Sequence, residues 1–143
     1  MIIFGIGGVG GDAACAVLRD GVLVAALEES KLTRLRANWG GHNDLPQHAI
    51  AACLELAGAK PEQVDAVAIV RPLPESGFDV KLRAQFPNSR IVVVEHHLAH
   101  AASAYYPSGF GEATVLTLDR GSDFRSGSRW FATSRRARSM RRN

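Results

Sequence analysis

Several features of secreted and membrane proteins are missing from this 143-residue sequence. No apolar run approaches the roughly 20 residues that a bilayer-spanning helix needs. The opening residues, 1–5, lack the basic segment with which a secretory signal begins. We therefore expect a cytoplasmic protein without membrane contact.

Cysteine is also scarce. The only two, Cys15 and Cys53, do not form a C-x-x-C pair and stand far apart in the sequence. Clustered cysteines are the usual sign of a disulfide framework or a structural zinc site. We therefore expect two buried free thiols. Hydrophobic residues make up 46% and charged residues 22% of the chain, which is ordinary for a single packed domain.

Acidic residues are absent from the last twelve positions, 132–143, which hold five arginines. Without this stretch the chain has 12 basic and 14 acidic residues, so its body is mildly acidic although the whole chain carries +3. A basic tail can bind nucleic acid non-specifically, but no aromatic residue lies among these arginines to stack on bases. We do not expect a nucleic-acid function. We predict a lobe over 1–130 and, over 131–143, a basic disordered tail or a frame-shifted end.

Strand and helix patterns alternate along the rest of the chain. Apolar and β-branched runs predict strands, helical spacing predicts helices, and Asp20-Gly21 predicts a hairpin turn. The expected strands are 2–6, 12–19, 22–27, 64–70, 91–94 and 113–118, the expected helices are 45–58, 78–86 and 98–106, and the expected loops begin at Pro61 and cover 119–128. The order β-β-β-α-β-α-β indicates an α/β fold, an RNase-H-like or actin-like lobe that forms an incomplete fragment of a two-lobe domain.

A glycine-rich start supports a rival interpretation. Residues 5–10 match G-x-G-x-x-G directly after a strand, and Glu28 lies near the place where a dinucleotide fold carries its ribose-binding acid. That fold needs a long crossover helix after the glycines, whereas Asp20-Gly21 interrupts the chain with a hairpin signal. The hairpin is the better interpretation, and a dinucleotide-binding protein stays the alternative.

The densest chemistry lies in residues 95–100, where three histidines follow a strand. His96 and His100 are four residues apart, so a helix would bring both imidazoles to one face. His97 is three residues from His100 and is a possible substitute. Asp119 ends the predicted strand 113–118, a common place for an active-site carboxylate. Two imidazoles and one carboxylate suit Zn²⁺ or Fe²⁺ with positions left open for substrate.

These segments also carry a resemblance to a known family. The stretch Val94-Glu95-His96-His97-Leu98-Ala99-His100-Ala101-Ala102-Ser103-Ala104-Tyr105-Tyr106-Pro107 resembles the signature of carbamoyltransferases of the antibiotic-biosynthesis and nodulation type. Residues 113–119, the hairpin 19–26 and Thr33-Arg34 resemble other parts of the family. The similarity runs from Ile2 to about Trp130.

The resemblance implies an actin-like fold related to the tRNA threonylcarbamoyl-transfer proteins. It implies O-carbamoyl transfer, in which carbamoyl phosphate and ATP give a carbamoyl-adenylate whose carbamoyl group passes to a small-molecule hydroxyl acceptor. It assigns a divalent metal, iron or zinc, to His96, His100 and Asp119. Asp12 in the glycine-rich loop and Arg34 are candidate contacts for nucleotide phosphate.

Some positions depart from the family pattern. The usual His-Asp-Ser loop reads Gly11-Asp12-Ala13, and Ala37 stands where a histidine is common. Arg120 puts a bulky cation where the family has a glycine after the metal-binding aspartate. Family members are several-fold longer, so we expect this chain alone to be inactive and to need a second lobe, which a separate chain could supply. A non-catalytic remnant that keeps a metal- or nucleotide-binding module is the alternative.

Overall fold

The computed structural model describes residues 1–9, 11–34, 45–71, 78–122, 125–133 and 141–142. The chain divides into two compact units, Met1–Val93 and Val94–Asn143. Among the described residues no helix is long and apolar enough to cross a membrane. Positions 36, 37 and 42 lie outside the described residues.

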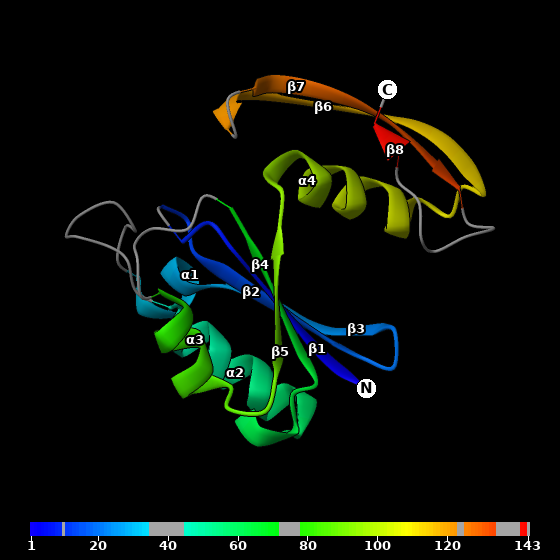
Figure 1. Ribbon diagram of the computed structural model, residues 1–143. Coiled ribbons are helices and arrows are strands. Elements are labelled where there is room, and N and C mark those ends of the chain that lie inside the picture. Colours follow the sequence, from blue (N-terminus) through cyan, green and yellow to red (C-terminus); the bar gives the residue numbers. More distant parts are fainter. Residues whose placement is uncertain (10, 35–44, 72–77, 123–124, 134–140, 143) are drawn as a thin grey trace. The chain divides into compact units, whose positions relative to one another are not determined.

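The first unit is built on a five-stranded sheet (Figure 1). Its strands are β1 (Ile2–Gly7), β2 (Ala14–Arg19), β3 (Val22–Glu28), β4 (Ala66–Val70) and β5 (Arg90–Val94). They lie in the order β3-β2-β1-β4-β5, with β1 antiparallel to β2 and parallel to β4. The predicted α/β fold, with three consecutive strands before the first helix, is confirmed.

The connection between β2 and β3 is a tight hairpin turn. Asp20 and Gly21 have φ of 52° and 83°, and two consecutive positive φ values are what a type I′ turn requires. A dinucleotide-binding unit would need a crossover helix and a parallel second strand. Because β1 passes directly into antiparallel β2, the structure contradicts the dinucleotide-binding alternative.

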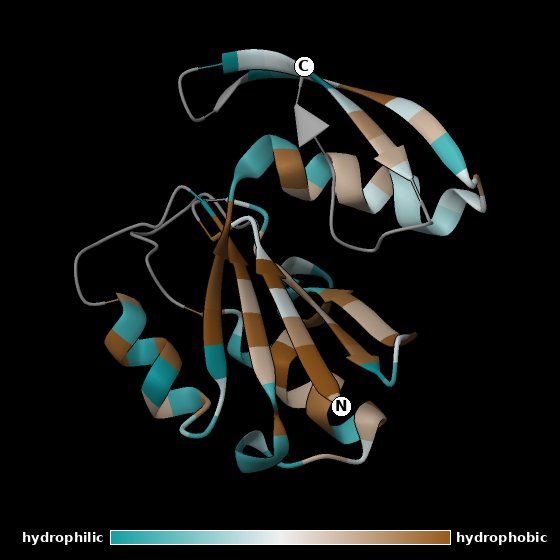
Figure 2. Cartoon of the chain, turned by 45° about the vertical axis from the view of Figure 1, so that its right-hand side comes forward, coloured by the Kyte–Doolittle hydropathy of each residue, from teal (hydrophilic) through white to brown (hydrophobic). Residues whose placement is uncertain are grey.

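Helices cover one face of the sheet. They are α1 (Glu29–Thr33), α2 (Gln47–Ala57) and α3 (Phe78–Gln85), with a short 3-10 turn, η1 (Pro61–Gln63). Alternate residues of a strand point to the same face, and the buried ones here are Cys15, Val17, Phe4, Ile6, Val67 and Ile69. They pack with the buried faces of α2 and α3 in one core. Figure 2 shows hydrophobic residues concentrated in these strands and a mixed pattern on the helices.

Helix α2 shows where helical spacing succeeds and where it fails. Ile50, Cys53 and Leu54 are buried as predicted, whereas Leu56 is 61% exposed. Leu56 lies six residues after Ile50, which is about 240° around a helix and so away from the core face. Gly58 ends the helix with φ of 56°, as expected for a glycine that follows a helix. The η1 turn occupies the start of the predicted loop at Pro61.

The second unit is a helix packed on a three-stranded sheet. Its elements are α4 (His96–Tyr105), the 3-10 turn η2 (Tyr106–Ser108), β6 (Glu112–Ser122), β7 (Arg125–Thr133) and β8 (Arg141–Arg142). The strands form an antiparallel sheet in the order β6-β7-β8. A small separate core joins one face of this sheet to α4, and it consists of Ala101, Tyr105, Val115, Trp130 and Ala132.

The polar loop predicted over 119–128 is wrong. Strand β6 continues to Ser122 and β7 begins at Arg125. Regular pairing runs from Glu112 opposite Thr133 to Leu118 opposite Gly127, then shifts, and resumes with Ser122 opposite Arg125. The polar residues gave no strand signal because pairing between two strands, not a hydrophobic period, extends this ribbon. Asp119 therefore lies within a strand, at a bulge.

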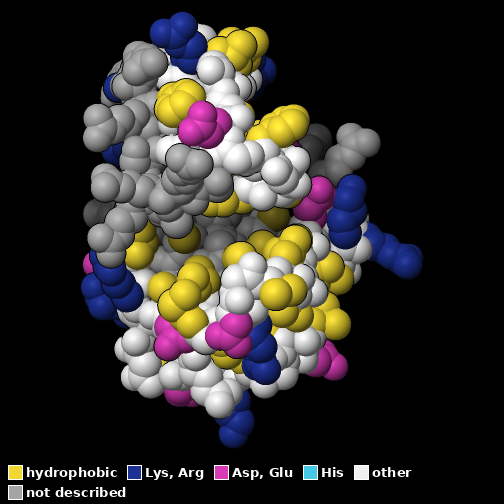
Figure 3. Space-filling view, turned by 90° about the vertical axis from the view of Figure 1, so that its right-hand side faces the viewer, with side chains coloured by type: hydrophobic (Ala, Val, Ile, Leu, Met, Phe, Trp, Pro, Cys, Tyr) yellow, Lys and Arg dark blue, Asp and Glu magenta, His cyan; other side chains and the backbone are white. Residues whose placement is uncertain are grey.

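Two further features bear on the surface and on the thiols. Val22, Leu23 and Val24 of the edge strand β3 are exposed, and Figure 3 shows hydrophobic side chains at the surface on the side of the molecule that it presents. Cys15 and Cys53 are both free and buried, as predicted. Their sulfur atoms lie 3.2 Å apart between β2 and α2.

Candidate metal centre

The site begins with the first turn of α4. Glu95 is the extended residue before the helix, and its carbonyl accepts the first helical hydrogen bond, from the Ala99 N–H at 2.9 Å. The helix therefore begins at His96, two residues earlier than predicted. Because both His96 and His100 are helical, their four-residue spacing places them on one face. The ring centroids lie 4.5 Å apart.

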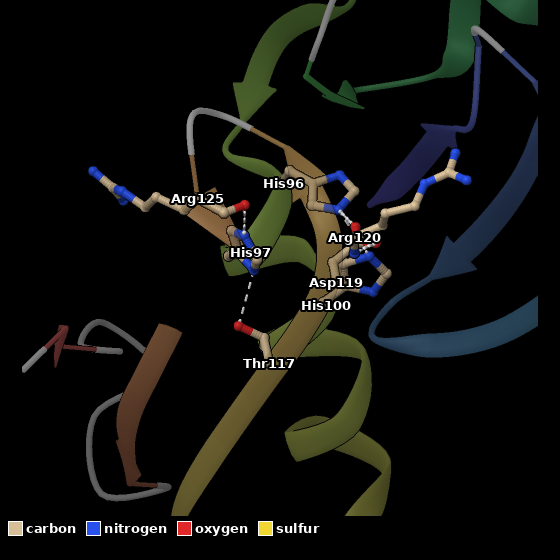
Figure 4. Close-up of polar contacts among 7 residues, drawn as sticks. All are labelled: His96, His97, His100, Thr117, Asp119, Arg120 and Arg125. Atoms are coloured by element: carbon tan, nitrogen blue, oxygen red, sulfur yellow. Dashed lines mark hydrogen bonds and ion pairs between the residues drawn. The ribbon is translucent and has the colours of Figure 1, made fainter. Parts of the chain in front are cut away.

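Three side chains converge in front of this face (Figure 4). His96 Nε2 lies 2.5 Å from Asp119 Oδ2 and 3.1 Å from His100 Nε2. The candidate ligand atoms of His96, His100 and Asp119 all lie within 4.8 Å of one another. The structure thus brings together the three residues that the sequence selects, two from α4 and one from the bulge of β6.

The carboxylate of Asp119 is held in its charged form. Its hydrogen bond with His96, followed by the Arg120 backbone N–H, which donates to Oδ1 at 2.6 Å, holds the pKa of Asp119 below its ordinary value. The side chains of His96 and Asp119 are 19% and 34% exposed. Both side chains are therefore partly accessible to solvent.

The donor set fits a transition-metal ion. Two nitrogen ligands at about 2.0–2.1 Å from a tetrahedral zinc ion lie roughly 3.3 Å apart, and the two Nε2 atoms here are 3.1 Å apart. The shorter contact to Asp119 is a hydrogen bond, whose hydrogen a metal ion would replace. Two imidazoles and one carboxylate suit Zn²⁺ or Fe²⁺. His96, His100 and Asp119 would hold such an ion.

His97 faces the other way. It is fully buried, and its Nδ1 lies 3.0 Å from Thr117 Oγ1 while its Nε2 lies 3.3 Å from the Arg125 carbonyl oxygen. Figure 4 shows its ring turned away from the three candidate ligands. His97 is therefore not placed to join this donor set.

The remaining candidates lie elsewhere or point away. Asp12, in the connection between β1 and β2, and Arg34, which ends α1 with φ of 60°, belong to the first unit and are exposed. The turn that carries Asp12 is tight, since the Ala13 N–H donates to the Gly11 carbonyl at 3.0 Å. Arg120 contributes its backbone N–H to the site, and Figure 4 shows its guanidinium extending away from the three ligand atoms.

Two residues near the site have no sequence signal of their own. Thr117 and Arg125 bind His97, and Arg125 Nη1 also lies 3.5 Å from Glu95 Oε1. Strand alternation is the one sequence feature that points to Thr117. Val115 and Thr117 lie two residues apart on the inward face of β6, and both are buried. A buried threonine needs a hydrogen-bond partner, and the inward histidine supplies it.

Solved structures similar to this chain support the fold. YeaZ from Pseudomonas aeruginosa matches with a TM-score of 0.58 and 15% identity, over 99% of this chain and 63% of that one. The ROK hexokinase from Thermus thermophilus matches with a TM-score of 0.60 and 15% identity, over 93% of this chain and 46% of that one. Both have the actin-like fold, and the predicted actin-like α/β class is confirmed.

Sequence relatives indicate the family that the chain resembles. The nodulation protein NolNO of Sinorhizobium fredii is 33% identical over 142 residues, covering 81% of this chain and 20% of the relative. Protein sll1178 of Synechocystis is 27% identical over 90% of this chain and 27% of its own length. The chain thus spans about a fifth to a quarter of these relatives. Residues 73–140 match the family model for the carbamoyltransferase N-terminus, so this chain is similar to the amino-terminal region of the carbamoyltransferase family.

Proposed function

We propose that this chain is the metal-bearing amino-terminal part of an O-carbamoyltransferase. The complete enzyme would form carbamoyl-adenylate from carbamoyl phosphate and ATP and pass the carbamoyl group to a small-molecule hydroxyl acceptor. The observation that carries the proposal is the convergence of His96, His100 and Asp119 within the segment that matches the carbamoyltransferase N-terminus.

Each residue has a defined part in this proposal. His96 and His100 offer nitrogen ligands from one helix face, and Asp119 offers an anionic oxygen while its Oδ1 accepts from the Arg120 N–H. A bound divalent ion would supply Lewis-acid polarisation of a phosphate or carbonyl oxygen. The partial exposure of His96 and Asp119 leaves room on the solvent side for a substrate oxygen.

The first unit would contribute phosphate contacts. Asp12 lies in the tight turn after β1, and Arg34 carries an exposed cation at the end of α1. An arginine can bind phosphate through two parallel hydrogen bonds. As part of the proposal, we assign Arg34 to a contact with nucleotide phosphate. We assign Asp12 to the phosphate-binding loop that follows β1.

A metal-binding module without transfer activity is the second candidate. It is favoured by the bulky Arg120 next to the site. Such a module would bind a metal through the same three residues. The two candidates therefore differ in chemistry, not in metal binding.

An exchange of segments tests the proposal. In the nodulation relative, the matching region would be replaced by this chain, and carbamoyl-phosphate-dependent ATP–pyrophosphate exchange would be measured, an assay that needs no knowledge of the acceptor. We expect exchange in the hybrid and its loss in the same hybrid carrying His96→Ala. His48→Ala is the matched control, because His48 is an exposed histidine in α2.

The outcomes separate the candidates. An active hybrid that loses exchange on His96→Ala supports the transferase. A folded hybrid that binds metal without exchange supports the metal-binding module. A hybrid whose exchange survives His96→Ala, His100→Ala and Asp119→Ala would rule out the proposed site.

A further inference from the structure

The bulge that carries Asp119 is not held by the regular strand ladder. Pairing of β6 with β7 is regular up to Leu118 opposite Gly127 and resumes only at Ser122 opposite Arg125. Residues 119–121 of β6 therefore face a single residue of β7. Bulges of this kind re-aim a side chain and leave some backbone groups without ladder bonds. The direction of Asp119 must depend on other contacts.

His97 makes contacts on both sides of that bulge. Its Nδ1 lies 3.0 Å from the hydroxyl of Thr117, two residues before Asp119 on the same strand. Its Nε2 lies 3.3 Å from the carbonyl oxygen of Arg125, where β7 begins. One ring from α4 thus joins both strands, and the shifted register lies between its two partners.

The chemistry of the partners fixes the form of the ring. A carbonyl oxygen only accepts, so Nε2 carries the hydrogen and donates to Arg125. Nδ1 then accepts from the Thr117 hydroxyl, whose hydrogen goes to the ring instead of to the Ser128 carbonyl at 3.3 Å. This neutral ring satisfies both contacts without placing a charge in a fully buried position.

The position of His97 on α4 links this contact to the metal ligands. His97 directly follows His96 and points into the core, while His96 and His100 point to the outer face. Among the histidines in the described part of the chain, only His97 is buried. The helix backbone therefore fixes how far the His96 and His100 rings lie from the His97 ring, which contacts β6 and β7.

We propose that His97 is a positioning residue, which clamps Thr117 and Arg125 on either side of the β6 bulge and so aims Asp119 at His96 and His100. The inference rests on the proposed metal site. Partners behind metal ligands commonly change metal affinity by about 10–100-fold when removed. His97 would act through the strand and would not touch the ion.

The test compares two variants that each remove one hydroxyl from the second unit. Thr117→Val removes the partner of His97, and Tyr105→Phe removes a hydroxyl that donates to the Gly111 carbonyl at 3.0 Å, near the other end of α4. Co²⁺ serves as the probe, and its visible absorption reports affinity and ligand arrangement. We expect Thr117→Val to weaken Co²⁺ binding about tenfold and to alter the spectrum. Tyr105→Phe should change neither, even with a similar loss of thermal stability.

A metal-free measurement separates this inference from the proposed function. The Arg120 amide donates to Asp119 Oδ1, so its hydrogen exchange reports the aim of the carboxylate. We expect faster exchange at Arg120 in Thr117→Val and His97→Leu and wild-type exchange in Tyr105→Phe. Unchanged exchange at Arg120 in a folded Thr117→Val variant would overturn the clamp. If the wild type did not bind Co²⁺, the proposed metal site would be wrong. The role of His97 would still be decided by the hydrogen exchange at Arg120.

Discussion

At the scale of single residues, the pH dependence of metal binding should reveal which groups hold the ion. The pKa of Asp119 lies below its ordinary value because of its hydrogen bonds to His96 and to the Arg120 N–H, so this carboxylate stays ionised through mildly acidic pH. A protonated imidazole cannot ligate a metal ion. We expect Zn²⁺ affinity in titration calorimetry to fall as the solution is acidified.

Substitutions identify the individual ligands. His96→Ala, His100→Ala and Asp119→Ala should each weaken Zn²⁺ binding by at least about tenfold, since a site with three protein ligands has none to spare. His48→Ala, which alters an exposed histidine of α2, should bind as the wild type does. Loss of binding in His97→Ala together with normal binding in His96→Ala would mean that the wrong histidine had been assigned.

The sequence could predict only part of this site. The four-residue spacing of His96 and His100 is a local property of a helix, so it was readable from the chain. The contacts of His97 depend on how β7 pairs with β6 and on where that register shifts. No local pattern encodes such a pairing, and for the same reason Asp119 was expected at the end of a strand instead of within one.

At the scale of elements, Glu29 supplies the cap that α2 lacks. The helix begins after Pro46, whose side chain makes no capping bond. Instead the Glu29 carboxylate accepts the backbone N–H groups of His48 at 3.1 Å and Ala49 at 2.7 Å. Partial burial would raise the pKa of Glu29, but these bonds and the His48 side chain outweigh burial and hold it below its ordinary value.

Glu29→Gln should therefore lower the free energy of unfolding by about 1 kcal/mol at neutral pH, measured by urea denaturation. Because the folded-state pKa is depressed, this contribution is complete above the ordinary carboxyl value near 4.5 and is lost as the pH falls through the folded-state value. Glu28→Gln is the control, since Glu28 is exposed and its carboxylate contacts Lys31 and the Ser30 hydroxyl, not the start of α2. An equal effect of both substitutions would refute the cap.

Two glycines of the first unit should respond differently to the same substitution. Gly8 and Gly21 both have positive φ, at 66° and 83°. A Cβ at Gly21 would meet open space, whereas a Cβ at Gly8 would lie 2.3 Å from the Asp12 carbonyl oxygen. We expect Gly21→Ala to cost about 1 kcal/mol from backbone strain and Gly8→Ala to cost about 1–3 kcal/mol more. Thermal unfolding measures both, and equal losses would contradict the close packing at Gly8.

Hairpins and helices were the elements that the sequence predicted best. Asp20-Gly21 has a turn preference that depends only on those two residues, and the hairpin formed where expected. The cap from Glu29 to α2 joins residues about 20 positions apart and left no local trace. The same limit applies to β8, which pairs with Trp130 and Phe131 although its own arginines give no strand signal.

At the scale of the whole molecule, the chain spans 20% of NolNO and 27% of sll1178. We expect the purified 143-residue chain to show no carbamoyl-phosphate-dependent ATP–pyrophosphate exchange, because the proposed function needs a second lobe. A radiolabel exchange assay checks this, with the hybrid enzyme as the positive control. Robust ATP–pyrophosphate exchange by the chain alone would contradict the proposal that it is one part of a larger active site.

The α/β class and the order of the first strands followed from the sequence, because buried apolar residues alternate along β1, β2 and β4. The division into two units was not readable. No proline- or glycine-rich linker marks it, since β5 runs to Val94 and α4 begins at His96. The second core around Tyr105 and Trp130 forms between segments whose apolar spacing is the same as in the first unit. That spacing alone does not show which of the two cores a segment joins.

The buried thiols have a practical consequence for following the metal centre. Burial, with the adjacent Cys53, raises the pKa of the Cys15 thiol, and a protonated, buried thiol is a poor nucleophile. A cysteine introduced at the exposed Ala104 of α4 would then be the reactive one in the folded protein. It would lie roughly 12 Å along the helix from His96. A maleimide dye attached there could report Co²⁺ arrival through quenching, which would turn this chain into a fluorescent sensor of its own metal site.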